Sequence, residues 1–416
     1  MSDQKTLEEY AKVCGAESID QLHQLANPLK DLKIVHVNST ASGGGVAEIL
    51  NKFVPMMQGL GIDAKWFVLE GSPDFFDCTK AMHNAIQGSE IVLTSTQLKV
   101  YEDVNMQNGE RLKDVLECAD IVFIHDPQPL PLIQHFPNKK GKWIWRCHID
   151  ASNPFGNLWD YLKKFVEQYD ATIFSLAEFT HPLSVPIFII APSIDPLAEK
   201  NIELAENEID KVYELFGLDR ARPIILQVSR FDRFKDPVGV IKAYRLVKKI
   251  NTDVQLVLAG SGAADDPEGM TIFKEVETVA ENDPDIHILL LPNDAHRIIN
   301  ALQRASNIVL QKSIREGFGL TVAEALWKRK PVIGGSTGGI RLQVINGETG
   351  FVVQTPEGAA YRIRYLLEHP EEGFQMGANG REYVRDKFLI TRQLAEYLTL
   401  IYSLQCTDAD RIELPV

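Results

Sequence analysis

The sequence predicts an α/β protein with two domains, each built on a parallel, doubly wound sheet. Short and nearly all-apolar runs recur along the whole chain, as expected of parallel strands that helices cover on both faces. Stretches of helical periodicity alternate with these runs. The chain also has 416 residues, which is more than one hydrophobic core of about 250–300 residues accommodates, so two domains are expected.

The first half begins with an apolar strand over residues 32–40, followed by the glycine turn SGGG and a helix over residues 46–60. A strand, a glycine turn and a helix form the opening unit of a doubly wound sheet. The segment APSIDPLAEKN, residues 191–201, contains two prolines and is predicted to link the two halves. Before this linker, a further helix is predicted from residue 157, and strands from residues 64, 119, 142, 171 and 185.

The same alternation restarts after the linker, and beyond residue 356 the chain is predicted to be helical. In open parallel sheets, ligands bind beyond the carboxyl ends of the strands. Polar motifs that directly follow strands are therefore the candidate binding residues. In this half, strands are predicted from residues 223, 254, 286, 307 and 331, and helices over residues 237–250, 270–281, 296–304 and 320–328.

The composition argues against several kinds of protein. A net charge of −14 is opposite to the basic face of a general nucleic-acid binder. The five cysteines show no C-x-x-C spacing, which disfavours a disulfide framework or a zinc site and suits a reducing cytoplasm. No apolar signal core is present near the start, and no run reaches the roughly 18 apolar residues that span a bilayer. We therefore expect a cytoplasmic protein that binds neither nucleic acid nor membrane.

Glycines after the first strand are candidates for holding an anion. Gly44 and Gly45 lie at the start of a predicted helix, where a glycine backbone approaches a phosphate closely and free N–H groups attract negative charge. The pattern is neither G-x-G-x-x-G nor a P-loop, so a dinucleotide site is disfavoured. A tight turn without a ligand explains these glycines equally well.

Two cations follow the first strand of the second half, in the segment QVSRFDRFKDP. Arg230 offers a planar fork to phosphate oxygens and Lys235 offers a point charge, so together they suit a diphosphate. Arg233 lies beside them and is explained as a solvated side chain. For each of these residues alone, a charged surface turn is the default interpretation.

Two carboxylates flank a second glycine turn, in the segment EGFGLTVAE. Glu316 precedes the turn, and Leu320 begins a helix whose amino terminus favours negative charge. Glu324 lies four residues beyond Leu320 and therefore on the same helix face. A retaining glycosidase needs two carboxyl groups about 5–5.5 Å apart, and a glutamate one turn inside a helix is poorly placed for that. An acidic first turn without any ligand explains Glu316 by itself.

Polar residues also follow two strands of the first half. Arg146, His148 and Asp150 follow one strand, and His125 and Asp126 follow another. A single histidine at a strand end more often has a structural role. Two polar strand ends in one domain nevertheless favour a binding pocket there.

The segment EGFGLTVAE resembles the E-x7-E signature of the family 4 retaining glycosyltransferases. The segments GGGVAEIL, SRFDRFKDP and GSTGGIRLQVINGETGFVV resemble other parts of that family, in the same order along the chain. The resemblance implies the GT-B fold, in which two Rossmann-like domains face each other across a cleft. It implies an acceptor-side domain over residues 1–192, a domain over residues 193–392 that binds the nucleotide sugar, and a helix over about residues 393–416 that packs back on the first domain.

A narrower resemblance is to the trehalose-synthesising branch, which contains glycosyltransferring trehalose synthases and retaining trehalose phosphorylases. It implies reversible transfer of glucose from a nucleoside diphosphate glucose to C1 of free glucose, giving α,α-trehalose. The chain length is near that of the compact synthases, which favours a synthase over a phosphorylase that uses glucose 1-phosphate. The segments that carry this resemblance are FIHDPQP, WRCHIDASNP, APSIDPLAEKN, DDPEG and SIREGFGLTV.

The resemblance also implies roles for individual residues. Arg230 and Lys235 match the diphosphate-binding pair. Glu316 matches the acid that touches the donor sugar, and Glu324 matches the acid that binds the ribose. His148 matches a histidine that helps to bind the donor glucose. Further binding candidates are the backbone of Gly317, Phe318, Gly319, Leu320 and Thr321, the first glycine loop with Gly44 and Gly45, and the strand-end residues Asp126 and Asp150.

Two positions depart from the common family pattern. Asp236 stands where a glycine commonly follows the lysine, and Leu342 stands where many relatives carry an acid, although the trehalose branch also lacks one. Residues 289–294 lie in the base-binding region and leave the preferred nucleotide open. The chain has no D-x-D pair at a suitable strand end, so neither a metal ion nor another cofactor is expected to be essential.

Three alternatives stay open. The first is a trehalose phosphorylase or another family 4 glycosyltransferase, and the second is a nucleotide-sugar epimerase of GT-B fold, which would need carboxylates poised for proton abstraction in the first half. The third is a sugar-binding protein without activity, which the intact Arg230, Lys235, Glu316 and Glu324 disfavour. The expected partners are a nucleoside diphosphate glucose, glucose and trehalose, and a homodimer is left open.

Overall fold

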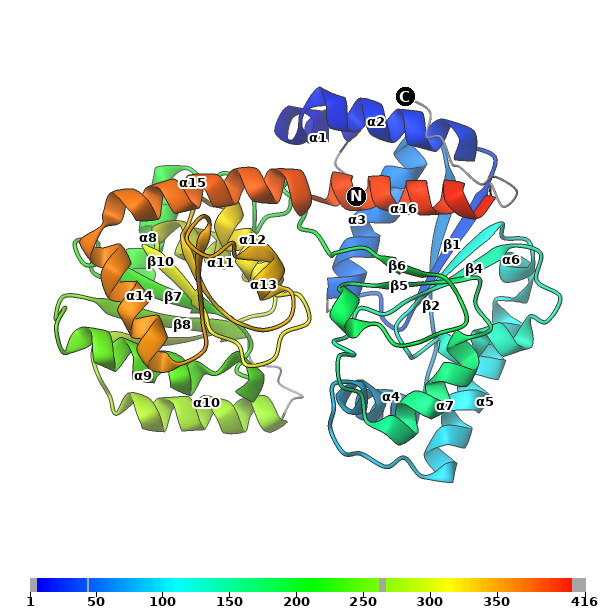
Figure 1. Cartoon of the computed structure of the whole chain (residues 1–416), viewed down its shortest axis with the longest axis horizontal. Helices are drawn as coiled ribbons and strands as arrows, with labels where there is room; N and C mark the ends of the chain where they lie inside the picture. The colour runs from blue at the N-terminus through cyan, green and yellow to red at the C-terminus, as the bar shows by residue number, and fades with distance from the viewer. Residues whose placement is uncertain (1–5, 43–44, 262–266, 406–416) are drawn as a thin grey trace. The chain divides into compact units, whose positions relative to one another are not determined.

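A computed structural model describes residues 6–42, 45–261 and 267–405 (Figure 1). The chain divides into two compact units. The first comprises Met1–Pro192 and Ile390–Val416, and the second comprises Ser193–Leu389. The chain therefore leaves the first unit at Pro192 and returns to it at Ile390.

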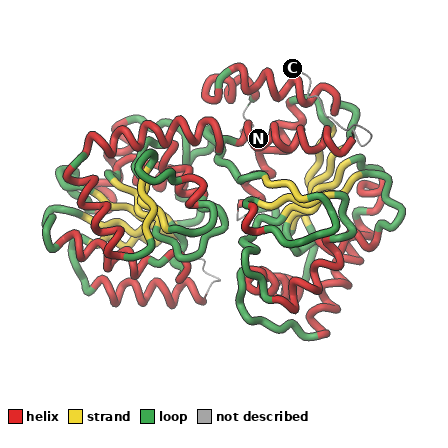
Figure 2. Tube along the Cα trace, in the orientation of Figure 1, coloured by secondary structure: helices red, strands yellow, loops and turns green. Residues whose placement is uncertain are grey.

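The first unit is built around a parallel sheet with helices packed against it (Figure 2). The described strands run in the order β2-β1-β3-β4-β5-β6, and every neighbouring pair is parallel. The order changes direction between β1 and β3, which makes this the switch point of the sheet. The strands are β1 (Lys33–Asn38), β2 (Asp63–Val68), β3 (Ile121–His125), β4 (Lys142–Arg146), β5 (Ala171–Phe174) and β6 (Ile187–Ile189).

The helices of this unit lie before, between and after these strands in the sequence. They are α1 (Leu7–Cys14), α2 (Ala16–Ala26), η1 (Asn27–Leu29), α3 (Gly45–Gly59), α4 (Pro73–Ile86), α5 (Ser95–Arg111), α6 (Lys113–Glu117), η2 (Leu130–His135), α7 (Gly156–Val166), η3 (Ala177–Phe179) and α16 (Ile390–Gln405). Helix α16 packs against α2 (Figure 1). Its Tyr397 ring lies 5.1 Å from the Phe53 ring of α3 and 5.2 Å from the Phe123 ring of β3.

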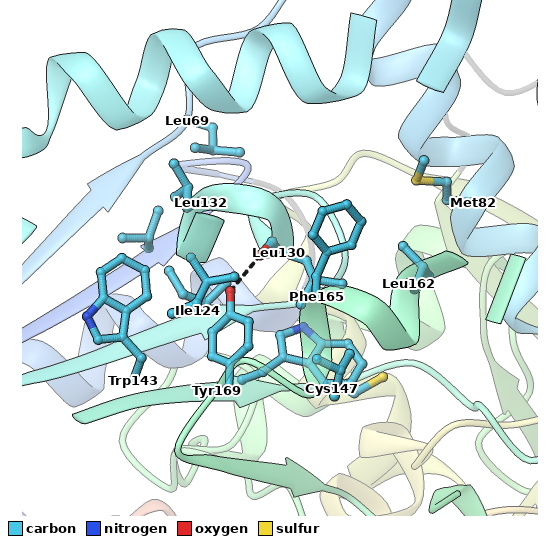
Figure 3. Close-up of a cluster of buried hydrophobic side chains, with 14 of the residues drawn as sticks. Leu69, Met82, Ile124, Leu130, Leu132, Trp143, Cys147, Leu162, Phe165 and Tyr169 are labelled. Atoms are coloured by element: carbon cyan, nitrogen blue, oxygen red, sulfur yellow. Dashed lines mark hydrogen bonds between the residues drawn. The ribbon is translucent and has the colours of Figure 1, made fainter. Parts of the chain in front are cut away.

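The strands of the first unit are almost entirely apolar because they lie in its hydrophobic core. All five residues of β3 are buried, because helices cover both faces of the sheet. The hydroxyl group of the buried Tyr169 is satisfied locally, since it donates to the carbonyl oxygen of Leu130 at 2.7 Å (Figure 3). Figure 3 shows this cluster around Ile124, Trp143, Phe165 and Leu162.

The second unit is a parallel sheet of the same kind. Its described strands run in the order β12-β11-β10-β7-β8-β9, so the switch point lies between β7 and β10. The strands are β7 (Ile224–Val228), β8 (Gln255–Ser261), β9 (Ile286–Leu291), β10 (Ile308–Gln311), β11 (Val332–Gly335) and β12 (Gly350–Val353). The helices are α8 (Glu206–Phe216), η4 (Arg233–Lys235), α9 (Pro237–Lys248), α10 (Pro267–Ala280), α11 (His296–Ala305), α12 (Leu320–Trp327), α13 (Ile340–Gln343), α14 (Pro356–Glu368) and α15 (Pro370–Lys387).

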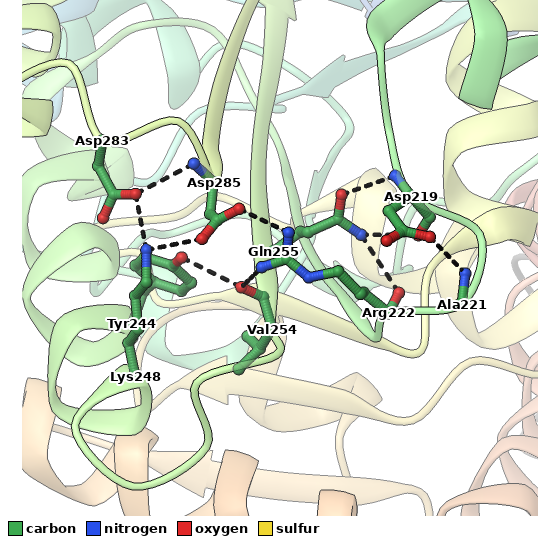
Figure 4. A network of polar contacts seen from close by, with 9 residues as sticks. All are labelled: Asp219, Ala221, Arg222, Tyr244, Lys248, Val254, Gln255, Asp283 and Asp285. Carbon is green, nitrogen blue, oxygen red and sulfur yellow. Dashed lines mark hydrogen bonds and ion pairs between the residues drawn. The ribbon is translucent and has the colours of Figure 1, made fainter.

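A polar network stabilises the amino-terminal end of β8, which is the end opposite to the expected binding edge (Figure 4). The side chain of Gln255 exchanges two hydrogen bonds of 2.8 Å with the backbone of Asp219. Asp285 accepts from Arg222 at 2.6 Å and lies 2.8 Å from the ammonium group of Lys248. The hydrogen bond from Arg222 is the main cause that lowers the pKa of Asp285 to about 2. We therefore interpret this network as structural, since it holds the amino-terminal end of β8 in place.

The predicted fold class is confirmed, because each unit is a doubly wound α/β sheet with parallel strands. The strand predicted to begin at residue 185 is shorter than expected, since β6 covers only Ile187–Ile189 and lies at the edge of its sheet, where both isoleucines are exposed. Within the described ranges, no helix is both long and apolar enough to cross a membrane.

Two glycines of α15 provide a test of how tightly this helix packs. A Cβ atom at Gly377 would lie 2.0 Å from the carbonyl oxygen of Arg329, whereas the nearest atom at Gly373 would be 3.7 Å away. We expect Gly373→Ala to stabilise the protein by up to about 1 kcal/mol through helix propensity. We expect Gly377→Ala to destabilise it by about 1–3 kcal/mol through overpacking. Urea unfolding of both variants measures this, and equal shifts of the same sign would contradict the packing.

Candidate active site

The switch point of the second unit brings together polar residues that follow two different strands. Arg230 and Lys235 follow β7, while Lys312, Ser313 and Glu316 follow β10. These two strands are hydrogen-bonded neighbours in the sheet. Because the strands are parallel, both sets of residues emerge at the same edge.

Lys235 and Glu316 form the central contact of this edge. The ammonium group of Lys235 donates to Oε2 of Glu316 at 2.7 Å, and the hydroxyl group of Ser313 donates to the same oxygen at 3.2 Å. The two charged side chains are 18% and 10% exposed, so this ion pair is largely shielded from water. The segments are also joined through the backbone, since the N–H group of Ile314 donates to the carbonyl oxygen of Phe234 at 2.8 Å. The orientation of the Glu316 carboxylate is therefore fixed from two sides.

Asp236 explains one departure from the family pattern. Its backbone has φ +51° and ψ +49°, the left-handed region that favours glycine and that aspartate tolerates better than most residues. Its side chain accepts from the N–H group of Gly239 at 3.1 Å and thereby caps α9. Lys312 donates to the other carboxylate oxygen. The aspartate thus keeps the backbone conformation of a glycine and adds a helix cap.

Arg230 lies on the same loop but outside the Lys235–Glu316 contact. Its side chain is 63% exposed, and its guanidinium group lies 3.5 Å from the carboxylate of Asp232. An exposed pair of this kind contributes little to stability. Arg230 is therefore the least constrained cation of this group.

The glycine turn between the two glutamates is held by a second glycine segment. Gly319 has φ +83°, and Gly338 has φ +44° with no room for a side chain, because a Cβ atom there would lie 1.6 Å from the carbonyl oxygen of Glu316. The amide group of Gln343 donates to the carbonyl oxygens of Phe318 at 2.6 Å and Gly339 at 3.1 Å. Gly319 has no side chain to cap α12, so the positive end of this helix, at Leu320 and Thr321, is left for an anion.

Glu324 lies one turn inside α12 and is buried, with a side chain that is only 4% exposed. Its Oε1 lies 3.4 Å from the ammonium group of Lys200, which offsets the cost of burying the charge. Lys328 donates to the backbone carbonyl oxygen of Glu324 and to the side chain of Asn201, both at 3.0 Å. Burial is the main cause that lowers the pKa of Lys328 to about 7. The structure therefore separates the two glutamates: Glu316 pairs with Lys235, and Glu324 pairs with Lys200.

The first unit contains a row of three histidines that runs from the interior of β1 to the ends of β3 and β4. Nδ1 of His36 lies 3.0 Å from Nε2 of His125, and Nδ1 of His125 lies 3.0 Å from Nε2 of His148. Successive rings are stacked, with centroids 5.3 Å apart. The rings form a line and do not converge on a point, and within the described residues no cluster of three or more His, Cys, Asp or Glu side chains is suited to a metal ion.

Asp126 positions the accessible end of this row. It adopts φ +65°, and its Oδ1 accepts from the backbone N–H group of His148 at 2.7 Å. Burial raises the pKa of Asp126 to about 7, although this hydrogen bond and the charge of Arg146 act in the opposite direction. Asp150 has a local role in the structure, because its Oδ1 accepts from the N–H group of Ser152 at 2.9 Å. Gly45 is the first residue of α3, and Gly44 lies outside the described residues.

Sequence reasoning missed several residues of these arrangements, among them His36, Lys200, Lys312 and Gln343. Lys312 directly follows the buried strand β10, and this position is a signal that could have identified it. His36 is a polar residue inside an apolar strand, which is a weaker signal. Nothing in the local sequence around Lys200 or Gln343 indicates that their partners are Glu324 and the glycine turn.

Comparison with known proteins identifies the family of the chain. Residues 36–181 match the family model described as the trehalose synthase N-terminal domain, and residues 209–383 match the model described as glycosyl transferases group 1. The chain is 48% identical to the trehalose synthase of Thermococcus litoralis, over 96% of this chain and 97% of that protein. The chain belongs to the trehalose synthase family. This trehalose synthase family member is thus a glycosyltransferase, and it has the GT-B fold that its resemblance implied.

The chain also matches proteins at lower sequence identity, and one of these is considerably longer than the chain. It is 29% identical to the trehalose phosphorylase of Pleurotus pulmonarius, over 95% of this chain but 61% of that protein. A solved structure of an α,α-trehalose-phosphate synthase (UDP-forming) from Burkholderia vietnamiensis superposes with a TM-score of 0.72 at 15% identity. That likeness covers 90% of this chain and 99% of the other, and at this identity it shows the fold alone.

The histidine row leads to a prediction about stability at acid pH. In an unfolded chain an imidazole titrates near pH 6.5, whereas burial lowers the pKa of His36 to about 3 in the folded protein. Between these values the unfolded chain binds more protons, so the free energy of unfolding falls as the pH falls. We expect His36→Phe to make this dependence shallower, with the difference in slope growing as the pH falls through 6.5 toward a limit of about 1.4 kcal/mol per pH unit. Urea unfolding at several pH values between 7.5 and about 5 measures it.

The matched control is His23→Phe, at an exposed position of α2. It makes the same chemical change without altering a buried ring, and its pH dependence should follow that of the wild type. If the free energy of unfolding becomes less dependent on pH by the same amount in both variants, the buried histidine is not the source of that dependence.

Proposed function

We propose that the chain is a retaining hexosyltransferase that transfers glucose from a nucleoside diphosphate glucose to C1 of free glucose, giving α,α-trehalose in a reversible reaction. The observation that carries this proposal is the Lys235–Glu316 ion pair, which lies beside the open start of α12 at the switch point. This arrangement sets a cation and a helix amino terminus beside a carboxylate, and so suits a diphosphate next to a sugar. The membership of the chain in the trehalose synthase family supports the choice of sugars.

The leaving group is a nucleoside diphosphate, whose developing negative charge must be stabilised. In the proposal, Arg230 and Lys235 bind its phosphate oxygens, and the N–H groups at the start of α12 supply further positive potential. The bond between C1 of the donor glucose and the diphosphate oxygen breaks, and a bond from C1 to the acceptor hydroxyl oxygen forms on the same face. The acceptor hydroxyl proton passes to the departing phosphate oxygen. This route needs no protein nucleophile.

The two glutamates have different roles in this proposal. Glu316 contacts hydroxyl groups of the donor glucose, and its fixed orientation between Lys235 and Ser313 suits a directional contact. Glu324 binds the ribose, and its distance of one helix turn from Gly319 separates it from the phosphates. In the first unit, His148 helps to bind the donor glucose, and Gly45, Asp126 and Asp150 are further substrate-binding residues.

A trehalose phosphorylase is the second candidate, because the chain is 29% identical to such enzymes over most of its length. The synthase is preferred because this chain spans 97% of a synthase but 61% of a phosphorylase. An epimerase would need carboxylates that abstract a proton, and a binding protein would not need groups that stabilise a leaving group, so neither explains Arg230, Lys235, Glu316 and Glu324 together as well as a glycosyltransferase does.

Product analysis tests the proposal directly. The protein is incubated with glucose and with UDP-, ADP- or GDP-glucose or glucose 1-phosphate, each with and without a chelator, and the sugars are separated by chromatography. We expect trehalose from at least one nucleotide sugar, equally with chelator. Lys235→Met keeps most of the side-chain length without the charge, and should lower turnover roughly 10²–10³-fold. Trehalose formed only from glucose 1-phosphate would establish the phosphorylase instead.

The roles of the glutamates are separated by steady-state kinetics with varied nucleotide sugar. Positive charge develops at C1 in the transition state, so Glu316→Gln should lower kcat much more than it raises KM. The ribose does not change during the reaction, so Glu324→Gln should mainly raise KM. Each variant retains the size of its side chain, and thermal unfolding checks that it is folded. The reverse pattern, with Glu324→Gln abolishing turnover and Glu316→Gln affecting only KM, would refute the assignment.

A further inference from the structure

The histidine row joins the interior of the first unit to its binding edge. His36 and His125 are buried, while His148 is partly exposed. His36 lies on β1 and His125 ends β3, so the two strands of the switch point each contribute one ring. His148 follows β4, and its Nδ1 has no hydrogen-bond partner among the described residues. One end of the row is therefore closed, and the other end is available to a ligand.

Each of the two contacts in the row requires one proton between two nitrogen atoms. Two arrangements of neutral rings meet this requirement, and the charged arrangement with the proton shared most evenly is a third; a doubly protonated His36 or His148 adds only a charge to one of the two neutral arrangements. In the first, every ring donates toward the interior, so that His36 carries a proton on Nε2 and His148 has a bare Nδ1. In the second, every ring donates toward the edge, so that Nε2 of His36 is bare and His148 carries a proton on Nδ1. In the third, His125 is an imidazolium that donates in both directions, and the outer rings carry protons on both of their free nitrogens.

The closed end of the row decides among these arrangements. Nε2 of His36 is buried and has no hydrogen-bond partner among the described residues. The first and third arrangements put an N–H group there, whereas the second leaves only a lone pair. Buried N–H groups without an acceptor are rarer than acceptors that lack a donor, because the unsatisfied donor bears the full cost of desolvation.

The third arrangement also places a positive charge in the interior. Arg146 is the charged side chain that acts on the row, and Asp126 accepts from the backbone of His148; Arg146 is in turn coupled to Tyr397 and Arg392 of α16. Burial lowers the pKa of His125 and of His148, and the charge of Arg146 lowers both further. All three rings are therefore neutral at pH 7, and the second arrangement remains.

We propose that His36 and His125 are positioning residues that fix His148 as the tautomer with its proton on Nδ1, so that the exposed side of the ring presents an N–H donor. The ligand is an oxygen acceptor, and under the proposed function it is a hydroxyl group of the donor glucose. The identity of this ligand rests on the proposed function, while the tautomer does not. Asp126 contributes because its Oδ1 accepts a hydrogen bond of 2.7 Å from the backbone N–H group of His148.

The tautomer is measured by NMR of the full chain labelled with ¹⁵N in its histidine rings. The signals of His148 are identified by their loss in His148→Gln. In the wild type we expect a protonated Nδ1 and an unprotonated Nε2 for this residue. A wild-type spectrum in which His148 carries its proton on Nε2 would overturn the proposal, whatever the activity of the protein.

Two substitutions of His36 test whether the row causes this tautomer. His36→Phe retains the stacking on Phe123, whose ring is 4.8 Å away at 8°, but removes the donor to His125. His36→Asn keeps an amide N–H close to the place of Nδ1. We expect His148 to become a mixture of tautomers in the phenylalanine variant and to remain protonated on Nδ1 in the asparagine variant. We expect kcat/KM for the nucleotide sugar to fall about tenfold in the first, the scale of one hydrogen bond, and to recover in the second.

Phe123→Leu is the matched control, because it disturbs the packing of the same stack without removing a nitrogen atom of the row. A change of tautomer in this control as large as in His36→Phe would assign the effect to packing and overturn the proposal. An unchanged tautomer in His36→Phe would also overturn it. If that variant does not fold, the wild-type and asparagine spectra still decide. If the tautomers are as expected but the protein makes no trehalose, the proposed function is rejected and the positioning role of His36 and His125 is retained.

Discussion

The parallel order of each sheet is the constraint on which the rest of this structure depends. A parallel sheet brings the carboxyl ends of all its strands to one edge, and the reversal of strand order makes a crevice there. In the second unit this brings Lys235 to Glu316, which are 81 residues apart in the sequence. In the first unit it brings His36 to His125, which are 89 residues apart. Neither contact could form from local structure alone.

The charged residues at the second switch point are mostly paired with one another. Lys235 pairs with Glu316, Lys312 with Asp236, and Lys200 with Glu324. Burying a charge without a partner is costly, so each carboxylate and its cation stabilise a position that would otherwise be unfavourable. Such pairs contribute orientation more than net stability. They hold the side chains at defined places along the edge before any ligand is bound.

The two ends of the second sheet serve different purposes. At the amino-terminal end of β8, Arg222 and Lys248 are both engaged by Asp285, and Gln255 closes the network with the backbone. At the carboxyl end, Arg230 remains largely exposed, and Gly319 leaves the start of α12 uncapped. The paired charges at the amino-terminal end provide rigidity, and the carboxyl end provides groups that a ligand can still engage.

The sequence by itself determined the alternation of strands and helices, the two α/β halves and the motifs that follow the strands. These depend on local periodicity and on the family signature around Glu316 and Glu324. Tertiary structure alone decided which of these residues touch. The pairing of Lys235 with Glu316 and of His36 with His125 follows from the order of strands within each sheet, whereas the pairing of Glu324 with Lys200 joins α12 to the segment before α8. That order is a property of long-range packing, because strands of the same apolar composition fit any position in a buried parallel sheet.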